Sequence, residues 1–244
     1  MAAKMMRIED SSATELVEER MVYEQLLPLD GARIVELGCG AAGYTRAITQ
    51  TGRPESIVAC EVDDRQHEKN LSITDLPGVK FVRAGAEAIP AEDSSVDIVL
   101  MFKSLHHVPV DAMGTALREI ARVLRPGGLA YISEPVYAGE FNEVLRLFHD
   151  EKGVRLAAFS AMKEAVREGV LELVEERFFR IRNEFQDFAD FEQRIIRATH
   201  TKHALSPELY ETVRQVFERH VGPEGACFAM PMRVDLLRRP DASG

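Results

Sequence analysis

Three glycines with the spacing GxGxxG, Gly38, Gly40 and Gly43, are the first residues in this chain whose type and spacing could do chemistry. Glycine lets the backbone turn tightly and lets a ligand approach the peptide planes, because no Cβ atom intervenes. By itself the pattern fits a dinucleotide site, or a tight turn that binds nothing.

Two acidic residues beside this loop narrow the choice of ligand. A pyrophosphate over the loop would be repelled by Glu36, whereas a sulfonium cofactor, with its ammonium group and positive sulfur, would be attracted. Glu61 ends the next apolar run, where a carboxylate can accept hydrogen bonds from both hydroxyls of a ribose, as acids do in NAD sites. Simpler roles stay open: Glu36 could cap backbone amides, and Glu61 could be an exposed charge.

Candidate catalytic and substrate-binding residues follow later in the chain. His106 and His107 could take a proton from an acceptor, since histidine titrates near neutral pH, or could only shape their loop. Lys103 could anchor an acidic acceptor or be a solvated lysine. Four further side chains could contact a substrate, although packing or surface exposure explains each one singly: Tyr23, Glu134, Tyr137 and His149.

Elements that would position these residues alternate between strand and helix patterns. A capping box at Ser12–Glu15 predicts an N-terminal helix that runs to about Leu27, before Pro28. The predicted strands are 34–37, 56–60, 79–82, 97–101 and 129–133, and the helices between them are 44–51, 65–76 and 111–124. This alternation requires parallel crossovers, so we expect a Rossmann-like, doubly wound α/β sheet with ligands beyond its carboxyl ends.

After residue 133 the rhythm changes. We expect helices over 141–170, 187–199 and 207–220, and strands over 172–185 and 228–237. The two strands would form an antiparallel hairpin at the sheet edge, which gives seven strands with an antiparallel last strand and helical lid insertions. Core packing is favoured over an acceptor pocket for the aromatic series Phe178, Phe179, Phe185, Phe188 and Phe191. We expect a single domain over 1–244, divided into an N-terminal helix (10–30), a cofactor-binding core (31–135), substrate-side elaborations (136–225) and a last strand (226–238).

Six short motifs occur in order, and together they resemble the class I S-adenosylmethionine-dependent methyltransferases, in the small-molecule branch that includes the ubiquinone/menaquinone type (methyltransferase type 11). They are Val35-Glu36-Leu37-Gly38-Cys39-Gly40, Glu61-Val62-Asp63, Ala86-Glu87-Ala88-Ile89-Pro90, Val96-Asp97-Ile98-Val99, Ser104-Leu105-His106-His107 and Leu124-Arg125-Pro126-Gly127-Gly128. The resemblance covers about residues 34–133, under half of the chain.

The resemblance implies S-adenosylmethionine as cofactor and S-adenosylhomocysteine as product. Glu36 and the backbone of Gly38, Cys39 and Gly40 would face the methionine portion, Glu61 would hold the ribose, and Val62 would pack on the adenine. The remaining cofactor residues implied are Thr45, Ala86, Glu87, Phe102 and Lys103. Two positions depart from the family pattern: Ala42 replaces the usual third glycine, and Gly85 replaces an aspartate that would accept from the adenine amino group.

Composition excludes some other classes. The formal net charge of −10 argues against nucleic acid as a partner, because binding to phosphates usually needs a basic face. Three cysteines without a CxxC pair favour a reducing, cytoplasmic location, and no segment has the pattern of a signal peptide or membrane span. The chemistry requires no metal, although His149, Asp150 and Glu151 form a group of ligand types. A homodimer is possible.

The predicted function is methyl transfer from S-adenosylmethionine to an O, N or C nucleophile of a small-molecule acceptor. Three alternatives stay open: a protein or RNA methyltransferase, a non-catalytic scaffold that keeps the cofactor site, and an NAD(P)-dependent oxidoreductase. Glu36 and the absence of a Tyr-xxx-Lys pair count against the oxidoreductase.

Overall fold

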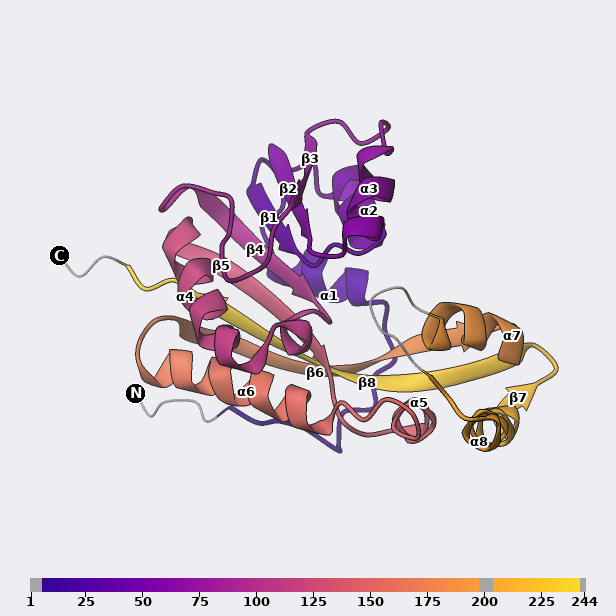
Figure 1. Cartoon of the computed structure of the whole chain (residues 1–244). Coiled ribbons are helices and arrows are strands. Elements are labelled where there is room, and N and C mark those ends of the chain that lie inside the picture. Colours follow the sequence, from indigo (N-terminus) through magenta and orange to yellow (C-terminus); the bar gives the residue numbers. More distant parts are fainter. Residues whose placement is uncertain (1–5, 198–203, 242–244) are drawn as a thin grey trace.

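The sheet runs in the order β3-β2-β1-β4-β5-β8-β6, and the short strand β7 pairs with β8 (Figure 1). The computed structural model describes residues 6–197 and 204–241. The strands are β1 (Arg33–Leu37), β2 (Ser56–Glu61), β3 (Val79–Arg83), β4 (Val96–Phe102), β5 (Leu124–Pro135), β6 (Glu172–Phe185), β7 (Val221–Gly222) and β8 (Gly225–Arg238).

The first five strands are parallel, and β8 lies antiparallel between β5 and β6. This confirms the predicted Rossmann-like fold with an antiparallel last strand, to which the structure adds β7. The predicted turn at Arg125–Gly128 is included in β5, and the β4–β5 register shifts between Val96 and Ile98.

Helices connect β1 to β2, β2 to β3 and β4 to β5, whereas β3 is joined to β4 by a loop. The helices are α1 (Glu19–Leu26), α2 (Gly43–Thr51), α3 (Asp64–Leu71), α4 (Met113–Val123), α5 (Glu140–Leu145), α6 (Lys152–Arg167), α7 (Phe188–Phe191) and α8 (Pro207–Glu218), with short helical turns at Leu105–His107, Val110–Ala112 and Glu192–Ile196. The predicted helix 65–76 is five residues too long at its end, because it stops where the Ser72 hydroxyl donates to the Lys69 carbonyl. Residues 198–199 of the predicted helix 187–199 lie outside the described residues.

The predicted N-terminal helix is wrong in its first half. Ser12 does not cap a helix: its amide and hydroxyl both donate to Asp10. The chain then runs extended beside β6, where the Val17 amide donates to the Arg180 carbonyl and the Arg180 amide donates to the Glu15 carbonyl. These bonds satisfy backbone groups on the edge strand, and this gain outweighs the local capping signal. The helix begins only at Glu19.

The sheet is covered on both faces. One face packs against α4 and α6 through Val99, Ile132, Leu117 and Met162. The other face packs against α1 and α2, which contribute Tyr23 and Ile48. The assignment of all helices in 141–170 to a lid is therefore wrong for α6, because its apolar side completes the main core.

Beyond the carboxyl end of β5, the hairpin of β6 and β8 continues as an arm. The last pair of β5 and β8 is Pro135 with Met232, but β6 stays paired with β8 for six more residues, to Phe185. The arm carries α5, α7 and α8 and extends past the ends of β4 and β5 (Figure 1). Its buried core is mostly phenylalanine: Phe141, Phe185, Phe188, Phe191, Phe217 and Phe228. Core packing is thus the role of Phe185, Phe188 and Phe191, and Phe179 is buried in the main core.

Candidate active site

The glycine loop joins β1 to α2 at the carboxyl edge of the sheet. Gly38 has φ +74° and Gly40 has φ +51°, a region that residues with a side chain rarely enter. A Cβ atom on Gly38 would lie 2.8 Å from the Cβ atom of Ser104, whereas a Cβ atom on Gly40 would meet open space. Close contact with the loop after β4 therefore requires glycine at 38, and Gly40 leaves its outer side open for a ligand.

Glu36 is buried at the end of β1. The hydroxyl of Thr45 on α2 donates to its carboxylate at 2.6 Å. Burial raises the pKa of Glu36 to about 7; the Thr45 bond opposes this shift, and the nearby charge of Glu61 adds to it. Among the described residues no basic side chain forms an ion pair with Glu36. The hydrogen bond from Thr45 thus fixes one oxygen of the Glu36 carboxylate. The carboxylate lacks the cation that would stabilise its negative charge.

Glu61 is the last residue of β2, and its carboxylate binds the backbone of the glycine loop. Its carboxylate accepts hydrogen bonds from the amides of Gly40 at 2.8 Å, Val62 at 2.8 Å and Asp63 at 2.9 Å. A carboxylate has about four acceptor positions, so about one remains for another donor. Binding both hydroxyls of a ribose would require one of these amides to move. The adjacent Val62 side chain is 61% exposed, as a surface for a flat apolar group would be.

Ala86 and Glu87 lie on the loop after β3. Ala86 is buried and Glu87 is exposed. A Cβ atom on Gly85 would lie 2.4 Å from both carboxylate oxygens of Glu87. The Glu87 carboxylate therefore occupies the space into which an aspartate at position 85 would extend.

Phe102 and Lys103 end β4 within a network that the sequence did not reveal. The Lys103 ammonium donates to Glu19 at 2.9 Å and to the Tyr44 hydroxyl at 2.6 Å, and Tyr44 donates to Glu19 at 2.5 Å. Ser133, at the end of β5, also donates to the buried Glu19. Lys103 is thus neutralised, which disfavours its predicted role as an anchor for an acidic acceptor, and its φ of +53° marks a strained position.

Aromatic rings surround this network. Phe102 stacks on Tyr44 with ring centroids 4.0 Å apart, and Tyr23 meets Phe102 edge-on at 5.7 Å. Tyr23 is fully buried, and burial raises its pKa to about 12. The structure therefore places Tyr23 in the packing between α1 and the sheet. The sequence did not predict Glu19 and Tyr44 as site residues. A single acidic residue or a single aromatic residue on a helix belongs to no motif with a defined spacing.

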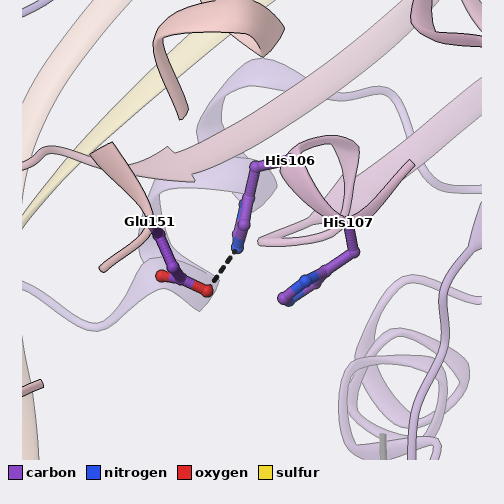
Figure 2. A group of neighbouring side chains, drawn as sticks. All are labelled: His106, His107 and Glu151. Carbon is purple, nitrogen blue, oxygen red and sulfur yellow. Dashed lines mark ion pairs between the residues drawn. The ribbon is translucent and has the colours of Figure 1, made fainter. Parts of the chain in front are cut away.

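Across the same edge, four residues from distant segments meet. His106 and His107 follow β4, Glu134 ends β5, and Glu151 precedes α6. The Nδ1 atom of His106 contacts the buried Glu134 carboxylate, and its Nε2 atom lies 3.6 Å from an oxygen of Glu151. His107 is exposed, and its ring lies 4.0 Å from that of His106 (Figure 2). Glu151 was named only as part of a group in the sequence, yet it completes this cluster.

The charges of this cluster affect what His106 can do. Burial lowers the pKa of His106, but the Glu134 and Glu151 carboxylates outweigh burial and raise it to about 9. Burial would raise the pKa of Glu134, and the charge of His106 outweighs it and holds it low. In this arrangement His106 is already protonated at neutral pH, so it cannot accept a proton from an acceptor without a change in its surroundings.

The remaining predicted substrate residues lie near this cluster. His149 contacts the same oxygen of Glu151 at 3.0 Å, and Arg155 binds the other oxygen at 2.5 Å. Tyr137 is half-buried and pairs with Asp150, the residue between His149 and Glu151, and the Lys152 ammonium lies 5.7 Å from the centre of its ring. The structure therefore brings together Glu134, His149 and both predicted catalytic histidines, with Tyr137 paired to the adjacent Asp150, while Tyr23 packs between α1 and the sheet.

Comparison with known proteins agrees with this architecture. Residues 35–132 match a family described as a methyltransferase domain. The phthiotriol/phenolphthiotriol dimycocerosates methyltransferase 1 of Mycobacterium ulcerans is 37% identical over 100 residues, which cover 41% of this chain and 36% of that protein. The chain thus spans less than two fifths of the length of the first curated relatives it matches.

Solved structures show the same fold over most of the chain. A candidate methyltransferase from Bacillus halodurans has a TM-score of 0.61 at 16% identity, with 90% of this chain and 98% of the other covered. The cyclase SpnF has a TM-score of 0.56 at 18% identity, with 91% of this chain and 80% of the other covered. Residues 35–132 therefore resemble a methyltransferase domain, and they lie within a Rossmann-like fold that the chain shares with these solved structures.

Proposed function

We propose that this protein transfers the methyl group of S-adenosylmethionine to a small-molecule acceptor. The observation that carries the proposal is Glu36, a buried carboxylate without a cationic partner directly before an open glycine loop. A ligand with an ammonium group and a positive sulfur would supply the missing cation, whereas a pyrophosphate would add a second negative charge. The unpaired Glu36 carboxylate therefore favours the sulfonium cofactor over a nicotinamide dinucleotide.

The residues present fit the rest of the cofactor. The open side of Gly40 admits a ligand to the loop backbone, Glu61 offers its free acceptor position to a ribose hydroxyl, and the exposed Val62 offers a surface to the adenine. Glu87 is the carboxylate closest to the position of the missing aspartate. The cofactor supplies an activated methyl carbon, and the protein has to align the acceptor with it and exclude water.

On the acceptor side, the proposal assigns binding to the edge formed by β4, β5 and the arm. The cluster of His106, His107 and Glu134 lies there, and the protonated His106 would orient a hydroxyl acceptor through a hydrogen bond. Several relatives are named for phthiotriol dimycocerosates, so an apolar alcohol is the first acceptor class to screen. The formal net charge of −10 argues against RNA as the acceptor.

Location is part of the same proposal. The structure describes no helix that is both long and apolar enough to cross a membrane. All three cysteines are unpaired, which is consistent with the predicted cytoplasmic location.

Calorimetric titration of the purified chain tests the cofactor. We expect S-adenosylhomocysteine to bind with micromolar affinity and NADH not to bind. Glu36→Gln should weaken the binding of S-adenosylhomocysteine by about tenfold or more, since a charge-assisted contact contributes about 1.5–3 kcal/mol. Glu55→Gln changes an acid outside the site and is the matched control. Binding of NADH alone would overturn the proposal, and so would equal affinity in the Glu36→Gln variant.

Methyl transfer itself needs a second measurement. The chain is incubated with S-adenosylmethionine and a panel of alcohols, phenols and amines, and a mass increase of one methyl group on an acceptor is the expected result. Cofactor binding without transfer to any acceptor would instead support the non-catalytic scaffold.

A further inference from the structure

We propose that His106, His107 and Glu151 bind a divalent transition-metal ion of the Zn²⁺ type beside the acceptor. Within the described ranges these three residues form a group whose ligand atoms all lie within 4.8 Å of one another. Their side chains converge on one point from the loop after β4 and the segment before α6 (Figure 2). The site is separate from the glycine loop and uses residues that cofactor binding does not require.

The distances are close to those of a coordinated ion. Zinc binds nitrogen and oxygen at about 2.1 Å, so ligand atoms in a tetrahedral site lie roughly 3.4 Å apart. His106 Nε2 and Glu151 Oε1 are already 3.6 Å apart. The ligand atom of His107 lies within 4.8 Å of the other two, so it would approach them by up to about 1.4 Å, which requires a rotation of this exposed side chain.

Surrounding groups orient the two buried ligands. The Glu134 carboxylate holds the Nδ1 side of His106, which directs Nε2 toward the other ligands, and the Leu105 amide holds Glu134 at 2.9 Å. A carboxylate behind a ligating histidine is the usual support of a metal site. Arg155 binds Oε2 of Glu151, so that Oε1 faces His106. The ion would take the place of the proton on Nε2.

Two imidazoles and one carboxylate are a donor set that suits zinc and neighbouring transition metals better than Mg²⁺ or Ca²⁺. Three protein ligands leave at least one position open. At this edge of the sheet, the open position could hold an acceptor oxygen and lower the pKa of its hydroxyl. This role rests on the proposed methyl transfer, whereas binding of the ion does not.

Titration with ZnCl2 tests the site directly. The full chain is stripped with a chelator and titrated calorimetrically, and we expect one site of micromolar affinity or tighter. His107→Ala should weaken zinc binding by about a hundredfold or more, because it removes a direct ligand while support from a neighbouring group alone contributes tenfold to a hundredfold. His107 is exposed, so this variant should fold normally. Glu151→Gln should have a similar effect.

His67→Gln changes a histidine on α3, far from the cluster in the sequence, and should leave the affinity unchanged. Substitution with Co²⁺ adds a spectroscopic readout, since visible absorption bands of a tetrahedral ion should appear in the wild type and vanish in His107→Ala. Zinc binding weaker than millimolar, or equal in wild type and His107→Ala, would overturn the proposal. The titration requires no methyl acceptor, so failure to transfer a methyl group is a separate result.

Discussion

The glycine loop and the arm both lie at the carboxyl edge of the sheet, but they are built from different kinds of contact. In the loop, backbone amides and carboxylates carry the structure: Glu61 alone accepts three amides, and Gly38 and Gly40 adopt positive φ. In the arm, α5, α7, α8 and the hairpin are joined by packed phenylalanine rings. One region is determined by backbone geometry and the other by apolar packing.

This difference shows why the cofactor is easier to identify than the acceptor. A position such as Gly38, which combines a positive φ with close contact to another segment, allows only glycine. The loop is therefore recognisable in the sequence from the spacing of its glycines. A packed aromatic core can be built from many combinations of apolar side chains with a similar total volume. Its residues therefore have no fixed spacing in the sequence. Specificity for the acceptor, if the arm contributes to it, is therefore encoded in a form that motifs do not reveal.

Truncating the centre of the arm should have the largest effect. Phe217 is fully buried, and its ring lies 4.8 Å from that of Phe191. Phe217→Ala should cost about 3–5 kcal/mol of unfolding free energy, the usual range for a buried phenylalanine, as measured by thermal or denaturant unfolding. The affinity for S-adenosylhomocysteine should stay within about twofold, because the arm and the glycine loop are separate regions. A twofold change in affinity corresponds to well under 1 kcal/mol of binding free energy.

Phe178→Ala, at a half-buried position on β6, is the control and should cost clearly less. A large loss of cofactor affinity in the Phe217→Ala variant would break the comparison, because it would show that loop and arm are energetically coupled.

A methyl group added to the loop should have the next largest effect. Gly38→Ala combines a positive φ, worth about 1–2 kcal/mol, with a contact to Ser104 that costs about 1–3 kcal/mol. We expect a loss of about 2–5 kcal/mol in unfolding free energy and no measurable binding of S-adenosylhomocysteine.

Gly40→Ala has the same sign of φ but open space around its Cβ atom, so only the backbone cost should appear. Equal destabilisation by Gly38→Ala and Gly40→Ala would show that the contact with Ser104 does not restrict the loop.

The charge of Glu36 predicts how cofactor binding depends on pH. Its pKa is raised to about 7 in the folded chain, above the ordinary value of 4.5, so folded protein binds the extra proton between these values and stability falls as pH rises through that window. A contact with the ammonium group of the ligand requires the ionised form of Glu36. Below pH 7 the affinity for S-adenosylhomocysteine should therefore fall by up to about tenfold per pH unit.

Calorimetry between about pH 5.5 and pH 8.5 measures this slope, given the folded pKa near 7. Thr45→Val should move the inflection to higher pH, because it removes the hydrogen bond that opposes the shift. An affinity independent of pH in the wild type would contradict a role for Glu36 in binding the ammonium group.

The same contrast explains how far the sequence could predict the structure. The strand 172–185 was predicted with its observed bounds and the strand from Ile34 to within one residue, because apolar runs and turns are local signals, whereas the last strand begins three residues before the predicted 228. The N-terminal helix was misplaced, because pairing of residues near Leu16 with β6 is a tertiary contact. The links of His106 with Glu134 and Glu151, and of Lys103 with Glu19, join residues 28 to 84 positions apart, which no spacing rule connects.

The smallest effect concerns Ala42, which stands where the family pattern has its third glycine. Ala42 precedes α2 with φ +61°, where alanine is strained by about 1 kcal/mol relative to glycine. Ala42→Gly should therefore raise the melting temperature by about 2–4 °C. The neighbouring Ala41 is exposed and has no positive φ, so Ala41→Gly should lower it slightly. If both variants lower the melting temperature, the loop tolerates a side chain at 42 without strain, and backbone geometry restricts its sequence only at Gly38 and Gly40.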